Sequence, residues 1–294
     1  MKIKRIFVNI IKKTFHVKNL TLYFRKKKHS IQKLIYKKKY NTFDIIRILQ
    51  NSGVQPGRPI IVHCAFGNLY NFEGTADELI DALLDYIGSE GTLCMPAYPK
   101  DKYNNKNTFD VLNTKSAAGY LSEVFRKRNG VKRSLNQLHS VCAFGKDADY
   151  IVNDHVNSRI CFDEHSPFYK IGQLGGYIVD LGLPEYYIGT GCHVCEALLF
   201  DEVPYFQRKF TKEIEFTYKD AQGRIVKHKM LTKASEPYVR DKSTSLIDTY
   251  FDNTKYKRTK LSNMWINVYD MKYLYTRLSE LALEKKCIYK YPKM

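Results

Sequence analysis

The densest cluster of residues able to do chemistry lies at positions 189–196, which read Gly-Thr-Gly-Cys-His-Val-Cys-Glu. His193 and Glu196 are three residues apart, so on a helix they share a face. A carboxylate in that position can orient an imidazole and raise its basicity. Glycines before a helix start expose backbone N–H groups that suit an anion or a developing oxyanion. The pattern is typical of a general base, although a capped helix with a salt-linked histidine would have the same spacing.

The same cluster contains two cysteines, Cys192 and Cys195, in a CxxC spacing. A zinc site would need a second pair at comparable spacing, and the sequence has none. A thioredoxin-like motif would follow a strand in a different context. A thiol nucleophile beside His193 is a further option, which we rank below a role for His193 as a general base. We therefore expect no metal and no redox role.

A second polar cluster contains Arg133, Ser134, His139 and Ser140, directly before an apolar run at 141–144. A His-Ser pair at the start of a buried strand could face a cleft. A polar strand end with all its hydrogen bonds satisfied explains the pattern equally well. Spacing leaves both interpretations open.

The elements that must position these residues can be read from hydrophobic periodicity. Helix-type spacing predicts a helix over 42–50, and a continuous apolar run predicts a buried strand over 60–63. A second helix is expected over 75–88 and a second strand over 91–96. Strands and helices that alternate about every 30 residues indicate an α/β sheet.

The second half of the chain continues this pattern. It predicts a helix over 119–128, strands over 141–144 and 177–181, a hairpin of 212–218 with 224–230, and a closing amphipathic helix over 269–286. We expect the hairpin to form a small lobe. With no internal repeat and no low-complexity linker, residues 41–294 are predicted to form one domain.

Composition confines the unusual charge to one end. The net charge is +18, but residues 1–40 hold 14 Lys and Arg with no Asp or Glu. Removing these 14 from the chain's 48 basic residues leaves 34 against 30 acidic ones, a net charge of +4. We interpret 1–40 as a basic extension, either an amphipathic helix on an anionic membrane surface or a helix packed on the body. A basic membrane- or nucleic-acid-binding protein is the competing class, but no nucleic-acid module is recognisable.

Targeting and redox features favour a cytoplasmic protein. No run of about 18 apolar residues predicts a spanning helix, and the N-terminal residues lack the pattern of a signal peptide. The seven cysteines are scattered and mostly lie in apolar runs, which suits buried thiols in a reducing compartment. We expect a monomer or a homodimer.

An ordered series of short motifs resembles the antibiotic N-acetyltransferase family, typified by the aminoglycoside 3-N-acetyltransferases. The series covers roughly residues 41–286: Val62-His63, the segment 88–96, Phe109-Asp110, Arg133-Ser134, the segment 139–145, His155, Ser166-Pro167-Phe168, Gly175-Gly176, and His193 with Glu196. The chain departs from the family at Asn136-Gln137, where His-Pro is frequent, and at Ala65, where Ser is usual.

This resemblance implies a fold, a co-substrate and a site. The fold would be a central mixed sheet flanked by helices, and the donor would be acetyl-CoA. His193 would be the general base, supported by Glu196, while His139, Ser140 and Arg133 would bind the acceptor. His63, Gly74 and Thr75 would border the CoA channel.

The acceptor is predicted from charge. Aminoglycosides are polycations and favour an acidic cleft, whereas the region between the second strand and the His-Ser motif is rich in cations: Lys100, Lys102, Lys106, Arg126, Lys127, Arg128, Lys132 and Arg133. This pattern favours a nucleotide-linked (dTDP) amino sugar from surface-polysaccharide synthesis, with an aminoglycoside as the alternative. CoA, which is itself anionic, could also account for these cations.

Overall fold

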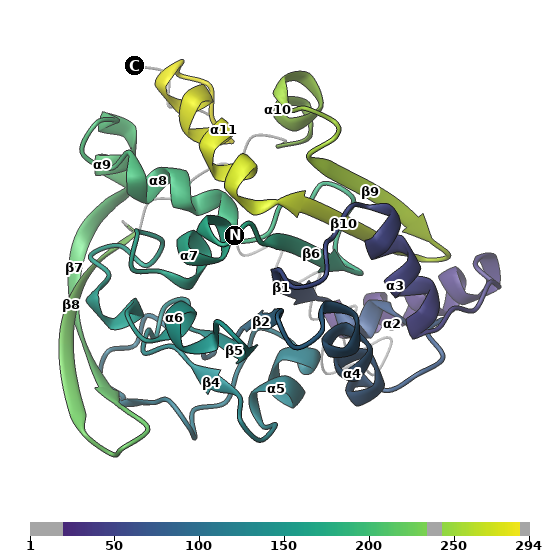
Figure 1. The fold of residues 1–294 in the computed structure, drawn as a ribbon, viewed down its shortest axis with the longest axis horizontal. Coiled ribbons are helices and arrows are strands. Elements are labelled where there is room, and N and C mark those ends of the chain that lie inside the picture. The colour runs from purple at the N-terminus through teal and green to yellow at the C-terminus, as the bar shows by residue number, and fades with distance from the viewer. Residues whose placement is uncertain (1–19, 234–242, 289–294) are drawn as a thin grey trace.

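A computed structural model describes residues 20–233 and 243–288, and it contains two sheets (Figure 1). The larger sheet has seven strands in the order β4 (Lys132–Arg133), β5 (Val141–Gly145), β2 (Thr92–Pro96), β1 (Pro59–Cys64), β6 (Tyr177–Leu181), β10 (Met264–Asp270) and β9 (Tyr256–Leu261). The smaller sheet has the order β3 (Phe109–Asp110), β7 (Phe210–Lys219) and β8 (Ile225–Lys233). The predicted α/β fold with a mixed sheet is confirmed.

The centre of the larger sheet is parallel and its flanks are antiparallel. β1 pairs in parallel with β2 and with β6, while β5 and β10 run antiparallel to their inner neighbours. Side chains alternate between the two faces: Ile61 belongs to one hydrophobic cluster, and Ile60 and Val62 belong to the other. By the same alternation His63 lies on the face of Ile61.

Helices cover both faces, as Figure 1 shows. Residues of α3 (Thr42–Asn51), α4 (Ala76–Ile87) and α5 (Tyr120–Arg126) join the cluster of Ile60 and Val62. Residues of α6 (Ala148–Val152), α7 (Pro167–Gln173), α8 (Val194–Leu198) and α11 (Met271–Leu283) join the cluster of Ile61. His63 therefore lies on the same side of the sheet as α8, which begins directly after His193.

The predicted hairpin is the long β7–β8 ribbon, which curves along one side of the molecule (Figure 1). It gains a third strand from β3, which pairs in parallel with β7. Phe216, Tyr218 and Met230 belong to the same cluster as the helices of that side. The ribbon is thus packed on the body and shares its core.

The C-terminal region differs from the prediction. The closing helix was predicted to begin at residue 269, but it begins at Met271. Residues 264–270 form strand β10, so the first two residues of the predicted helix belong to that strand. The change occurs at Asp270, whose side chain accepts a hydrogen bond from the backbone N–H of Tyr273 and caps α11. Strand β9, a charged sequence at the sheet edge, was not predicted at all.

The N-terminal extension is described only from residue 20. Residues 20–35 form helix α2 (Leu20–Ile35), on which Phe24, Ile31 and Leu34 are exposed. The amphipathic pattern predicted over residues 3–15 lies outside the described residues, and the domain boundary at 40/41 stays a prediction. In the part of the chain that the structure describes, no helix is long and apolar enough to cross a membrane.

Candidate active site

His193 ends the short 3-10 helix η3 (Gly191–His193) and directly precedes α8. This geometry places the Glu196 side chain one turn further on, and Oε1 of Glu196 lies 2.8 Å from Nδ1 of His193. The other carboxylate oxygen, Oε2, accepts a hydrogen bond from the ammonium of Lys209, the last residue of α9 (Pro204–Lys209). The side chains of Glu196 and Lys209 are each 1% exposed and that of His193 is 7% exposed. The histidine is thus the outermost member of a buried row of three.

The charges in this row are set by burial and by the ion pair. Burial lowers the pKa of His193 to about 3, against the opposing attraction of Glu196. Burial also penalises the Glu196 carboxylate, yet attraction to His193 and to Lys209 holds its pKa well below its usual value. At neutral pH the imidazole is therefore uncharged. With Glu196 accepting a hydrogen bond from Nδ1–H, the lone pair of His193 lies on Nε2.

A chain of rings leads away from His193. The His193 ring lies 5.1 Å from the ring of Phe162, which lies 4.6 Å from the ring of His139, and that ring is 5.6 Å from Tyr98. The ammonium of Lys102 lies 3.0 Å from Nε2 of His139. Burial lowers the pKa of Lys102 to about 8. The structure thus brings His139 near His193 through one phenylalanine.

Ser140 and Arg133 have other surroundings. Ser140 is fully buried, and within the described residues its hydroxyl has no hydrogen-bond partner. The guanidinium of Arg133 donates to the backbone carbonyls of Ala97, Val111 and Thr114, and it stacks 4.5 Å from the Phe109 ring centre. Arg133 therefore fastens the loop before α5 to the sheet.

A cavity of about 700 Å³ opens at the carboxyl ends of β1 and β2. Ligands of α/β sheets commonly bind at this end of parallel strands. The cavity is lined by His63, Cys64, Ala65, Phe66, Gly67, Asn68, Pro96, Tyr98, Ala118, Gly119, Tyr120, Ser122, Leu183, Tyr187 and Thr190. Tyr98, the last ring of the chain that starts at His193, thus also lines the cavity. Thr190, in the turn directly before η3 and His193, lines it as well.

Of the residues expected to border the CoA channel, only His63 lines this cavity. Gly74 and Thr75 are exposed and lie outside it. The Thr75 hydroxyl accepts a hydrogen bond from the backbone N–H of Glu78, whose carboxylate bonds back to Thr75. This reciprocal arrangement caps α4, so in this structure the side chains of Thr75 and Glu78 stabilise the start of that helix.

Within the described part of the chain, His63 is hydrogen-bonded at Nε2, whereas its Nδ1 only lies close to a carboxylate without an aligned hydrogen bond. Its Nε2 lies 2.9 Å from the hydroxyl oxygen of Thr190, and its Nδ1 lies 3.1 Å from Oδ1 of Asp180. His63 and Asp180 face each other because the β1–β6 register makes them neighbours. Asp180 is fully buried, and burial raises its pKa to about 6.

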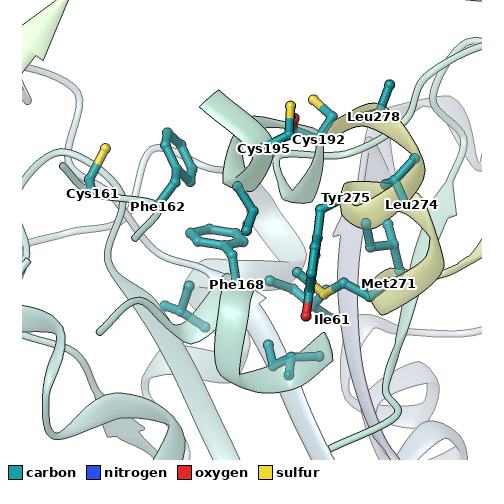
Figure 2. Packing of buried hydrophobic residues seen from close by; sticks show 14 of the residues in the cluster. Ile61, Cys161, Phe162, Phe168, Cys192, Cys195, Met271, Leu274, Tyr275 and Leu278 are labelled. Carbon is teal, nitrogen blue, oxygen red and sulfur yellow. The ribbon is translucent and has the colours of Figure 1, made fainter. Parts of the chain in front are cut away.

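The cysteines of the CxxC lie in apolar surroundings. Figure 2 shows Cys192 and Cys195 beside Leu274 and Leu278 of α11. Burial, followed by the nearby charge of Glu196, raises the pKa of Cys195 well above its usual value. All seven cysteines are outside disulfides. Among the described residues, no group of three or more His, Cys, Asp or Glu could hold a metal ion.

The cation cluster predicted from the sequence does not gather at His193. Arg126 and Lys127 pair with Glu123, Arg128 with Asp77 and Asp81, and Lys132 with Asp149. Lys102 is the member that reaches the ring chain. Burial is the main cause that lowers the pKa of both His139 and His193, and the positive charge of Lys233 on β8 adds to it.

Sequence reasoning missed Lys209, Asp180, Thr190 and Phe162. Asp180 left a readable signal, since a carboxylate within the apolar strand Tyr177–Leu181 needs a buried partner. Lys209 gave none, because it follows Arg208 at the end of a short helix, where cations are common.

Comparison with known proteins identifies the family of the chain. The family described as aminoglycoside 3-N-acetyltransferase matches residues 61–281. Aminoglycoside N(3)-acetyltransferase IV from Salmonella sp is 30% identical over 168 residues, or 55% of this chain and 60% of the relative. The aligned region thus spans about three fifths of that curated relative.

Solved structures that share the fold include the following two. The crystal structure of aminoglycoside acetyltransferase AAC(3)-Xa has a TM-score of 0.73 at 21% identity, covering 89% of this chain and 99% of that one. The structure titled AAC-IIIb binary with CoASH has a TM-score of 0.70 at 20% identity, covering 87% and 100%. Because the family pattern matches residues 61–281, from within β1 to within α11, the chain belongs to the aminoglycoside 3-N-acetyltransferase family.

Proposed function

We propose that the chain transfers an acetyl group from acetyl-CoA to an amino group of a sugar, with His193 as the general base and Glu196 as its support. The observation that carries the proposal is the hydrogen bond from Nδ1 of His193 to Glu196, which leaves the lone pair on Nε2. Family membership and the CoA-bound fold relative support the donor.

The chemistry follows from the charges of the row. The amine nitrogen attacks the thioester carbonyl, and Nε2 of His193 takes a proton from that nitrogen. The resulting imidazolium is stabilised by the Glu196 carboxylate, which Lys209 keeps ionised. Collapse of the tetrahedral intermediate breaks the C–S bond and releases the CoA thiolate, which takes up the proton from the His193 imidazolium and so restores the neutral base. The cavity lined by His63 and Tyr98 is our candidate for the donor channel.

An aminoglycoside is the first candidate acceptor. The curated relative and the fold relatives are named as aminoglycoside acetyltransferases. The names of the relatives thus favour this class over the nucleotide sugar that we predicted from charge. The pairing of Arg126, Arg128 and Lys132 with carboxylates away from the site also weakens that charge argument.

A nucleotide-linked amino sugar is the second candidate, because one specific observation favours it. The ammonium of Lys102 lies 3.0 Å from Nε2 of His139, and the positive charge of Lys233 adds to the effect of burial in lowering the pKa of both His139 and His193. A polycation would be repelled there, whereas a diphosphate would be attracted.

The acceptor test measures thiol release from acetyl-CoA with a panel of aminoglycosides and a panel of dTDP-amino sugars. Turnover with aminoglycosides alone would reject the nucleotide sugar, and turnover with dTDP-amino sugars alone would reject the aminoglycoside. No amine-dependent thiol release from either panel would contradict the proposed function.

The base is tested with His193→Asn. General-base catalysis contributes typically about 10²–10⁴-fold, so kcat should fall by that factor in a variant that keeps the wild-type circular dichroism spectrum. His228→Asn is the matched control, because His228 lies on β8 and bonds the carbonyl of Ser158. Near-normal turnover of His193→Asn would reject His193 as the base.

A further inference from the structure

A second row of acid–base groups lies at the cavity wall, separate from His193. It consists of Thr190, His63 and Asp180, joined by contacts of 2.9 Å and 3.1 Å through the two nitrogens of the His63 ring. His63 and Thr190 both line the cavity of about 700 Å³, while Asp180 is buried behind them. A hydroxyl hydrogen-bonded to an imidazole that has a carboxylate beside its other nitrogen is the order of groups found around an activated nucleophile.

The hydrogen bonds favour one direction for the proton. The backbone N–H of Thr190 also points at Nε2 of His63, at 3.4 Å. A nitrogen that accepts a hydrogen bond from an N–H carries the lone pair, so the lone pair is on Nε2 and the hydrogen is on Nδ1, the nitrogen that lies 3.1 Å from Oδ1 of Asp180. In this tautomer the Thr190 hydroxyl donates to Nε2, and His63 is ready to take its proton.

The carboxylate of Asp180, behind His63, is not used by any other contact described above. Among the described residues, neither oxygen of Asp180 has an aligned hydrogen bond, and His63 is its ion-pair partner. Burying a carboxylate in an apolar strand is costly unless it is paired. Its cost is explained if the carboxylate stabilises an imidazolium that forms on His63.

We propose that Thr190 is an acyl-accepting nucleophile, which gives the chain a second activity: hydrolysis of a small acyl thioester when no amine is present. The Thr190 hydroxyl oxygen attacks the thioester carbonyl while His63 takes its proton. The C–S bond then breaks, the thiolate leaves and receives that proton from His63, and the acyl group is held as an ester on Thr190. Water adds to the ester with the same base, releasing the carboxylic acid and restoring the hydroxyl.

With acetyl-CoA as the thioester, this inference rests on the proposed function. It differs from that function in its nucleophile, its base and its need for an amine. His193 is the base that acts on an external amine, whereas His63 acts on a hydroxyl of the chain itself.

The experiment measures thiol release from acetyl-CoA without any amine, in the full chain and in four variants. Thr190→Val removes the hydroxyl and keeps the side-chain shape, and its rate should fall at least about 100-fold, the scale of acid–base activation. Thr190→Ser should restore much of the rate. His63→Gln should match Thr190→Val. Thr259→Val is the control, because Thr259 lies on edge strand β9, three strands from β1.

A second measurement looks for the intermediate. Acid quenching followed by mass spectrometry should find one acetyl group on the peptide that contains Thr190, and none in Thr190→Val. A wild-type rate no faster than the uncatalysed one would overturn the proposal. So would release that persists in Thr190→Val, which would leave Thr190 and His63 as supports of the turn that carries His193.

A substrate without CoA, p-nitrophenyl acetate, tests the Thr190 nucleophile independently of the proposed acetyltransferase function. Hydrolysis of this ester that depends on Thr190, without any reaction of acetyl-CoA, would keep the nucleophile and reject the CoA-dependent function. Amine acetylation by acetyl-CoA without amine-independent release from either substrate would keep the proposed function and reject the nucleophile.

Discussion

Replacing Lys209 with methionine removes the cation that the structure places on Oε2 of Glu196. Both side chains are 1% exposed, so water cannot take the place of the lost ammonium. Among the described residues, His193 would remain as the hydrogen-bond partner of the buried carboxylate, and it is a weak one because burial disfavours the imidazolium. Methionine itself fits the site, since it is close to lysine in length and is apolar.

The magnitude follows from breaking one side of a buried ion pair. Such a change typically costs about 3–5 kcal/mol, because one charge is left without compensation. For a protein of this size that loss lowers the urea midpoint by roughly 1–2 M. Removing both charges should cost less, so Lys209→Met combined with Glu196→Gln should recover at least half of the loss.

The assay is equilibrium unfolding in urea, followed by circular dichroism. Lys229→Met is the matched control, since its pair with Glu213 is more than half exposed and such pairs contribute up to about 1 kcal/mol. If Lys209→Met were as stable as this control, the buried charge of Glu196 would not depend on Lys209. If the double variant were less stable than Lys209→Met, the loss would come from packing.

Three further outcomes are expected. Burial is the main cause that lowers the pKa of His155 and of His193 to about 3. Between about pH 6.5 and pH 3 the unfolded chain therefore binds more protons than the folded one, and the free energy of unfolding should fall by roughly 1.4 kcal/mol per pH unit for each histidine as the pH is lowered. Urea midpoints that are equal at pH 7 and pH 4.5 would contradict this. Arg133→Met leaves backbone carbonyls without a donor and should cost roughly 3 kcal/mol, measured against Lys132→Met, which loses only a half-exposed pair with Asp149. Gly145→Ala should unfold at clearly lower temperature in a thermal melt, because φ is +129° and the new Cβ would overlap the Gly91 carbonyl; an unchanged melting temperature would show that the strand end can shift.

Much of the fold could be predicted because its central strands are continuous apolar runs between clear helix signals. β1, β2 and β6 are buried along nearly their whole length, so periodicity located them within a residue or two. The edge strand β9 is rich in lysine and arginine, which blunts an exposed edge but hides the strand from a hydrophobicity pattern. β10 was merged with the following helix because apolar residues continue from Tyr269 into α11.

The site could be predicted only where its members are close in sequence. His193 and Glu196 lie three residues apart, and local spacing was enough to pair them. Lys209 is 13 residues from Glu196, and Thr190 is 127 residues from His63. Those contacts are made by packing between distant segments, and the neighbouring position of Asp180 and His63 is set by the register of β1 with β6; a local pattern contains neither.

The burial of the Glu196–Lys209 pair also has a consequence for ionic strength. Dissolved ions screen charges that are in contact with water, over about 8 Å at physiological salt, and they reach buried pairs far less. The basicity that Glu196 lends to His193 should therefore hardly change as salt is added. The pairs at the surface, such as that of Arg128 with Asp77 and Asp81, should weaken. Added salt should therefore weaken the ion pairs at the surface and leave proton transfer at His193 nearly unchanged.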